Sequence, residues 1–152
     1  MKRALLLLLL ACEPSLPWDG SASVHVSGAV SAALPGQISA YRNLDGSGQI
    51  YLQVLTGRDG VQFVTLGFDF SADALRPDTP MTRWEGSVSL VDGQLFKVSS
   101  FSGTGSAQLH LDTVTLMDQK NLGADKYEIH GRIDASLVQD HTGLTVQLTA
   151  AF

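Results

Sequence analysis

The sequence predicts an all-β fold, an antiparallel β-sandwich of about eight or nine strands, with a small closed β-barrel as the alternative. Three observations support this prediction. Apolar residues recur at every second position from Ser23 onward, turn-forming pairs separate these stretches at short intervals, and no stretch has a convincing helical period. Short strands joined by frequent turns are typical of sandwiches and small barrels.

The clearest predicted strand covers residues 126–138. Its odd positions include Tyr127, Ile129, Ile133 and Leu137, whereas its even positions carry polar side chains such as His130. Side chains of a strand alternate between its two faces, so this pattern describes a strand that is buried on one side and wet on the other.

The other segments repeat this alternation less purely. In chain order, the predicted strands are residues 23–34, 37–43, 49–56, 61–70, 84–91, 94–101, 106–117, 126–138 and 144–152. The turns expected between them are Pro35-Gly36, Asp45-Gly46, Asp59-Gly60, Asp92-Gly93 and His141-Thr142-Gly143. Glycine and its acidic neighbours accept the positive φ angles of tight hairpin turns.

One strand changes its inward face part-way along. Up to Leu111 the apolar residues of segment 106–117 occupy odd positions, and from Val114 they occupy even positions. An extra residue at Asp112 or Thr113, a β-bulge, would keep both apolar sets on the same side. We therefore expect a bulge there.

Composition and charge limit the classes of function. The 152 residues are 44% hydrophobic and 16% charged, which favours one globular domain over a disordered chain. The net charge is −5, and two of the ten basic residues, Lys2 and Arg3, lie at the N-terminus. Acidic side chains repel phosphates, so we do not expect a nucleic-acid partner.

The N-terminus has the pattern of an export signal. Lys2 and Arg3 precede a leucine-rich run that ends at Ala11 and is too short to span a bilayer. Leu9-Leu10-Ala11-Cys12 resembles the lipobox of bacterial lipoproteins, although Leu10 is bulkier than is usual there. The resemblance implies that the chain is cut before Cys12, that the Cys12 thiol carries a diacylglycerol (palmitate-type) anchor, and that the protein is bound to a membrane.

A lone cysteine supports this interpretation. Cys12 is the only cysteine of the chain, and an unpaired thiol in an oxidising compartment is a hazard unless it has a covalent role. A plain secretory signal with an accidental cysteine is the alternative. Because Glu13 rather than Asp follows Cys12, resemblance to enterobacterial sorting rules implies the outer membrane.

The predicted organisation is therefore a signal peptide, a tether and one domain. Residues 1–11 are the signal, residues 12–22 the lipidated cysteine with its tether, and residues 23–152 the all-β domain. The tether is rich in proline, glycine and serine, and ten such residues reach at most about 35 Å. The domain is then held close to its membrane.

No catalytic, metal or cofactor site is predicted. Asn43, Asp45 and Ser47 resemble the start of an EF-hand loop, but Val54 stands where the bidentate Glu is needed, so a hairpin turn is expected instead. The four histidines lie on wet strand faces or in a turn, without the spacing of a zinc site: His25, His110, His130 and His141. No nucleophile elbow or phosphate-binding loop is present.

We expect an envelope lipoprotein that is not an enzyme and that binds an envelope protein or polysaccharide or has a structural role. A small-ligand carrier or hydrolase is the first alternative, with its cleft sought near residues 71–83 and 118–125, because long connections often carry function. The second is an eight-stranded outer-membrane barrel, since the last strand alternates apolar residues and ends on Phe152, as such barrels do.

Overall fold

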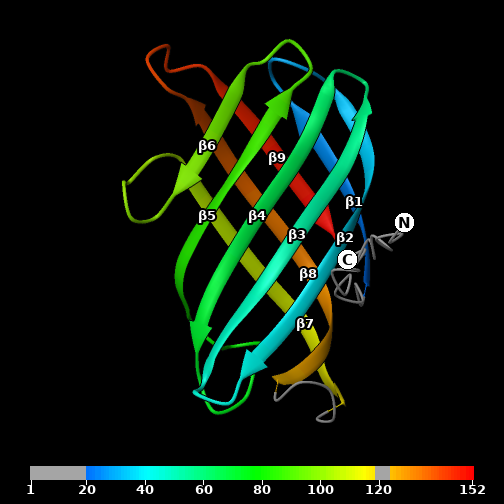
Figure 1. Ribbon diagram of the computed structural model, residues 1–152, viewed down its shortest axis with the longest axis vertical. Coiled ribbons are helices and arrows are strands. Elements are labelled where there is room, and N and C mark those ends of the chain that lie inside the picture. The colour runs from blue at the N-terminus through cyan, green and yellow to red at the C-terminus, as the bar shows by residue number, and fades with distance from the viewer. Residues whose placement is uncertain (1–19, 119–123) are drawn as a thin grey trace, which may run out of the picture.

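The computed structural model describes residues 20–118 and 124–152 as an all-β molecule of nine strands (Figure 1). The strands are β1 (Gly20–Ser27), β2 (Ala32–Asn43), β3 (Ser47–Arg58), β4 (Val61–Ser71), β5 (Met81–Leu90), β6 (Leu95–Ser99), β7 (Ser106–Asp118), β8 (Ala124–Gln139) and β9 (Thr145–Ala151). No helix long and apolar enough to cross a membrane occurs in this part of the chain.

The strands form one antiparallel sheet in the order β6-β5-β4-β3-β2-β1-β9-β8-β7. β6 also pairs with β8, through Phe96 with Gln139 and Lys97 with Val138, so the hydrogen bonding returns on itself as a ring. Among the described strands, β7 pairs only with β8, so it takes no part in this ring of hydrogen bonds. The predicted all-β, antiparallel fold of eight or nine strands is confirmed.

The strands lie in two layers around one core. In Figure 1, β3, β4 and β5 lie in front of β8 and β9. Within residues 20–118 and 124–152, thirty buried apolar residues form a single cluster between the layers. Phe68, Phe70 and Phe96 are the largest of its side chains with less than about 2% exposure. On β8, Tyr127, Ile129, Ile133 and Leu137 are all buried, as their alternation predicted.

Most predicted turns and the bulge are confirmed. Positive φ angles occur at Gly46, at Asp59 with Gly60, at Gly93, and at His141 with Gly143. The pairing of β7 with β8 shifts register between Leu111 and Thr113, which leaves Asp112 as the extra residue.

The turn predicted at Pro35-Gly36 is wrong. β2 runs straight through both residues, and the chain reverses earlier, between Ser27 and Ala32. Pro35 pairs with Ser23 of β1, whereas the pairing of β2 with β3 starts only at Gln37. Proline is therefore tolerated, because its missing N–H deprives no β3 residue of a partner. A Cβ on Gly36 would lie 3.0 Å from Val24 and 3.1 Å from Val54, so glycine lets these core residues approach.

Candidate functional site

The predicted lipid-attachment residue, Cys12, lies outside the described residues, and so do residues 119–123 of the second candidate loop. The first candidate loop is described as residues 72–80, between β4 and β5. Its Leu75 is buried, whereas Thr79 and Pro80 reach the mouth of a surface hollow on the β5 side.

The histidines are exposed, as expected from their positions. The structure brings His110 within 3.1 Å of Asp112 and His130 within 3.5 Å of Glu128, each pair on one strand face. Among residues 20–118 and 124–152, no three His, Cys, Asp or Glu side chains come together in an arrangement that would hold a metal ion.

The segment that resembles an EF-hand loop is a hairpin turn between β2 and β3, as expected. Asp45 accepts hydrogen bonds from the main-chain N–H of Ser47 at 2.9 Å and from its hydroxyl at 2.6 Å. These bonds lower the pKa of the Asp45 carboxyl. The carboxylate therefore closes its own turn.

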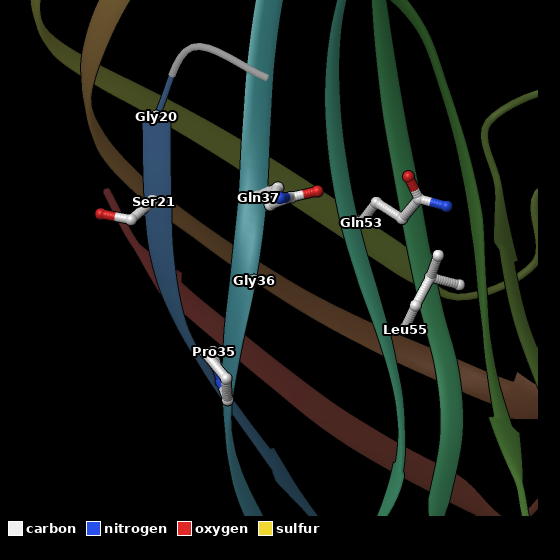
Figure 2. A pocket seen from close by; sticks show the side chains of 7 residues that line it. All are labelled: Gly20, Ser21, Pro35, Gly36, Gln37, Gln53 and Leu55. Carbon is white, nitrogen blue, oxygen red and sulfur yellow. The ribbon is translucent and has the colours of Figure 1, made fainter. Parts of the chain in front are cut away.

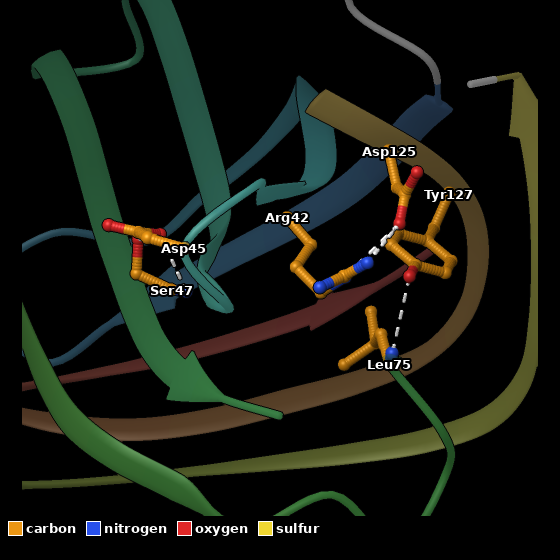
Figure 3. A network of polar contacts seen from close by, with 6 residues as sticks. All are labelled: Arg42, Asp45, Ser47, Leu75, Asp125 and Tyr127. Carbon is orange, nitrogen blue, oxygen red and sulfur yellow. Dashed lines mark hydrogen bonds and ion pairs between the residues drawn. The ribbon is translucent and has the colours of Figure 1, made fainter. Parts of the chain in front are cut away.

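A polar network joins the end of β2 to the start of β8 (Figure 3). Arg42 donates to Asp125 through Nε at 3.1 Å and Nη2 at 2.6 Å. The hydrogen bond to Asp125, followed by one to Tyr127, raises the pKa of Arg42. The hydroxyl of Tyr127 accepts from the main-chain N–H of Leu75 at 3.4 Å. The network thus holds the loop before β5 against this end of the molecule, which is a structural role.

One surface hollow lies over β1, β2 and β3 (Figure 2). Its lining contains two amides, one hydroxyl and no charged side chain: Gly20, Ser21, Pro35, Gly36, Gln37, Gln53 and Leu55. With so few directional groups it has little means of selecting a ligand.

A second hollow has a richer lining, and we call it the β3–β6 groove. It is a shallow groove of about 620 Å³ on the outer face of β3, β4, β5 and β6 and of the loop after β6. Its polar lining consists of Gln49, Tyr51, Thr65, Glu85, Ser87, Lys97, Ser99, Ser102, Thr104 and Asp140. Hydroxyls, one amide, two carboxylates and one ammonium therefore share one surface with an aromatic ring.

Gly67 leaves room in the β3–β6 groove. It lies on β4 between Thr65 and Asp69, and a Cβ there would meet Gln49 Nε2 at 3.5 Å and Tyr51 Cδ2 at 3.6 Å. Those distances are ordinary van der Waals contacts. The absent side chain thus exposes the edge of the Tyr51 ring and the Gln49 amide to the groove.

Hydrogen bonds fix the side chains at one end of the groove. The Tyr41 hydroxyl donates to Gln49 Oε1 at 3.1 Å, and Gln49 Nε2 donates to Asp69 Oδ1 at 2.9 Å. Burial and the nearby Asp69 raise the pKa of Tyr41, so its hydroxyl keeps its proton at neutral pH. The chain of bonds orients the Gln49 amide before any ligand arrives.

The charged side chains of the groove lie on β5, on β6 and in the loop after β8. Lys97 Nζ donates to Asp140 Oδ2 at 2.9 Å, and both side chains are about half exposed. The Lys97 hydrogen bond is the main cause that lowers the pKa of Asp140. Glu85 pairs with Arg83 on the same face of β5. All these side chains are about half exposed and remain in contact with water.

The sequence reasoning missed this groove. Its residues come from four strands and two loops, and each carries an ordinary outward-facing polar side chain. A usable signal is present nonetheless, because Tyr51 and Gly67 fall at outward positions, where sheets more often carry short polar or charged residues.

Comparison with known proteins gives no relative: no family model matches the chain, and no curated protein or solved structure matches it.

Proposed function

We propose that this protein is an envelope lipoprotein, anchored through Cys12, whose β domain binds a neutral polysaccharide chain in the β3–β6 groove without transforming it. The lipidation rests on the lipobox-like sequence that ends at Cys12. The binding role rests on the groove, which combines the Tyr51 ring with several hydroxyl groups and the Gln49 amide.

The chemistry of the groove supports a sugar ligand. A sugar ring offers hydroxyls on its rim and C–H groups on its faces. Hydroxyl and amide side chains both donate and accept, so Thr65, Ser87 and Gln49 match the rim of a sugar. The partly buried Tyr51 supplies an apolar surface with little side-chain entropy to lose on binding.

The charge of the groove favours a neutral chain. The groove carries two carboxylates, Glu85 and Asp140, and one ammonium, Lys97, in a protein whose net charge is −5. A polyanionic glycan would be repelled by this surface. The glycan strands of peptidoglycan are neutral apart from their peptide stems, and a lipid anchor would hold the domain near such a polymer.

The lowered pKa of Asp140 favours binding over hydrolysis. Glycoside hydrolysis needs one carboxyl group that keeps its proton near neutral pH, which demands a raised pKa. In the groove the pKa of Asp140 is lowered, and the side chain of Glu85 is 59% exposed beside Arg83. Both groups are suited to accepting hydrogen bonds from sugar hydroxyls.

Co-sedimentation of the purified full chain with peptidoglycan sacculi tests the groove. Gly67→Ala adds a methyl group that the fold accommodates at 3.5 Å or more, and we expect it to weaken binding without lowering the melting temperature. Tyr51→Ala should weaken binding further, by about 0.5–1.5 kcal/mol, because it removes the ring on which a sugar would pack. Thr149→Ala, on the outer face of β9, is the matched control. Equal binding by all four proteins would refute the groove as the site.

Metabolic labelling with radioactive palmitate tests the anchor. The wild-type chain should take up label and fractionate with membranes, whereas Cys12→Ser should remain unlabelled and enter the aqueous fraction. Labelling of the Cys12→Ser variant would exclude Cys12 as the acceptor.

A further inference from the structure

The ring of hydrogen-bonded strands has a gap between β5 and β7, next to the point where β6 pairs with β8. β5 pairs with β6 only from Glu85 to Ser89, and its first residues, from Met81, have no strand on that side within residues 20–118 and 124–152. β7 pairs with β8 along one edge, and no described strand pairs with its other edge near Leu109. On β5, the main-chain N–H and C=O of Trp84 bond to Ser100, so the free strand edge that borders this opening is that of β7.

The register shows which main-chain groups of β7 are free. Gly131 exchanges both of its main-chain hydrogen bonds with Phe152, on the β9 side of β8. The next residue, Arg132, therefore directs its N–H and C=O toward its partner on β7, His110. By the same alternation, Leu109 and Ala107 direct their main-chain groups away from β8, toward the opening.

The opening is a hollow with apolar side chains on both flanks and polar side chains around its rim, and we call it the β5–β7 slot. It measures about 490 Å³ and is lined by core or core-packed side chains from both flanks, Phe68, Met81 and Trp84 on one side and Ala107 and Leu109 on the other. His110, Arg132 and Asp134 lie at its polar rim. It shares no lining residue with the β3–β6 groove.

An unsatisfied donor lies beside the slot. The indole N–H of Trp84 is buried and has no hydrogen-bond acceptor in the described part of the chain. Buried polar groups are almost always paired in folded proteins, so an orphan donor needs an explanation. A main-chain carbonyl brought into the slot is an acceptor of the right kind.

We propose that the β5–β7 slot binds a single extended peptide segment of a partner protein by strand addition. The free groups of Ala107 and Leu109 would pair with its backbone, and its alternate apolar side chains would enter the slot toward Phe68 and Met81. This function is separate from polysaccharide binding. The edge strand of a second copy does not suit the slot. That strand belongs to a sheet of its own, and the strands of this protein on both sides of the slot leave no room for a second sheet.

Selection from a phage-displayed library of random dodecapeptides on the purified full chain tests the proposal. The enriched peptides should alternate apolar and polar residues. Leu109→Pro removes a free edge N–H, at a kind of position where proline is tolerated, and should weaken their binding about tenfold or more. Trp84→Phe keeps an aromatic ring but removes the orphan N–H, and it should also weaken binding. Lys97→Ala, in the β3–β6 groove, should have no effect.

The outcomes separate the alternatives. Circular dichroism and melting temperature establish whether each variant is folded. If one of the two slot variants, Leu109→Pro or Trp84→Phe, does not fold, the other still provides the test. Failure to enrich any peptide, or peptides indifferent to both slot variants, would overturn the proposal. So would a dimer in sedimentation that Leu109→Pro dissociates, because the edge would then belong to a second copy of this chain.

Discussion

Glycines inside the strands of this protein differ in how closely their neighbours approach them. A Cβ on Gly131 would lie 2.1 Å from the carbonyl oxygen of His110 and 3.1 Å from the Cα of Leu111, both main-chain atoms of β7. A Cβ on Gly67 meets nothing closer than 3.5 Å. The two glycines lie in similar strands but differ in what surrounds them, so their alanine variants form a matched pair.

We expect Gly131→Ala to lower the free energy of unfolding by about 1–3 kcal/mol, because β7 must move away from β8. Gly67→Ala should leave it unchanged or slightly higher, since alanine loses less backbone entropy on folding. Urea unfolding of both variants measures the difference. Equal stability of the two would contradict the close approach of β7 at Gly131.

Asp140 contributes to the loss of folding stability that we expect at acidic pH. The hydrogen bond from Lys97 holds the pKa of this carboxyl below its ordinary value. A carboxyl whose pKa is depressed in the folded state stabilises the protein above its unfolded-state pKa, and this contribution is lost as pH falls through the folded-state pKa. Asp140→Asn should therefore reduce the loss of stability below about pH 4.

Melting temperatures recorded from neutral to acidic pH measure this effect. Asp78→Asn, which removes an exposed carboxylate in the loop before β5, is the control. If Asp140→Asn and the control decline in parallel with the wild type, the Lys97–Asp140 contact contributes nothing in solution.

At the scale of elements, local sequence signals worked where the chemistry itself is local. Asp59-Gly60 and Asp92-Gly93 form turns because their backbone angles suit few other residues, and the shift of the apolar face at Asp112 shows directly as a bulge. Pro35-Gly36 carries an equally strong turn signal but lies within β2. At these two residues the chain stays extended because the pairing of β2 with β3 begins only at Gln37 and because Val24 packs against Gly36. Neither contact can be read from the local sequence.

The free edge of β7 makes a prediction of its own. Amide protons of Gln108 and His110 are paired with β8, whereas those of Ala107 and Leu109 face the β5–β7 slot. Native-state hydrogen exchange followed by NMR should show alternating protection along this stretch, slow at the even positions and fast at the odd ones. Uniform protection would mean that the edge of β7 is covered in the free protein.

At the scale of the whole molecule, two things were not predictable from the sequence. Alternation gave the all-β class and the strand number, but the strand order depends on which distant edges meet, such as β6 with β8. The β3–β6 groove was not predictable for the same reason. Its hydroxyls on β4, β5 and β6 become one surface only after four strands align.

Phe96 lies where the ring of strands closes, and we expect its side chain to contribute strongly to the free energy of unfolding. Its side chain is fully buried and its backbone pairs with Gln139, where β6 meets β8. We expect Phe96→Ala to cost about 3–5 kcal/mol in the free energy of unfolding. Phe101→Ala is the matched control, since Phe101 is 91% exposed in the loop after β6, and it should change stability by less than about 0.5 kcal/mol. Similar losses of unfolding free energy in the two variants would contradict the burial of Phe96 in the core.

The most direct test of the account is an NMR titration of the isotope-labelled protein with soluble, neutral oligosaccharides of N-acetylglucosamine. We predict that the perturbed resonances belong to the β3–β6 groove, above all to Tyr51, Gly67 and Ser87, and that Gly67→Ala weakens the response. Perturbations confined to the hollow over β1–β3 or to the β5–β7 slot, or no perturbation at all, would contradict polysaccharide binding in the groove.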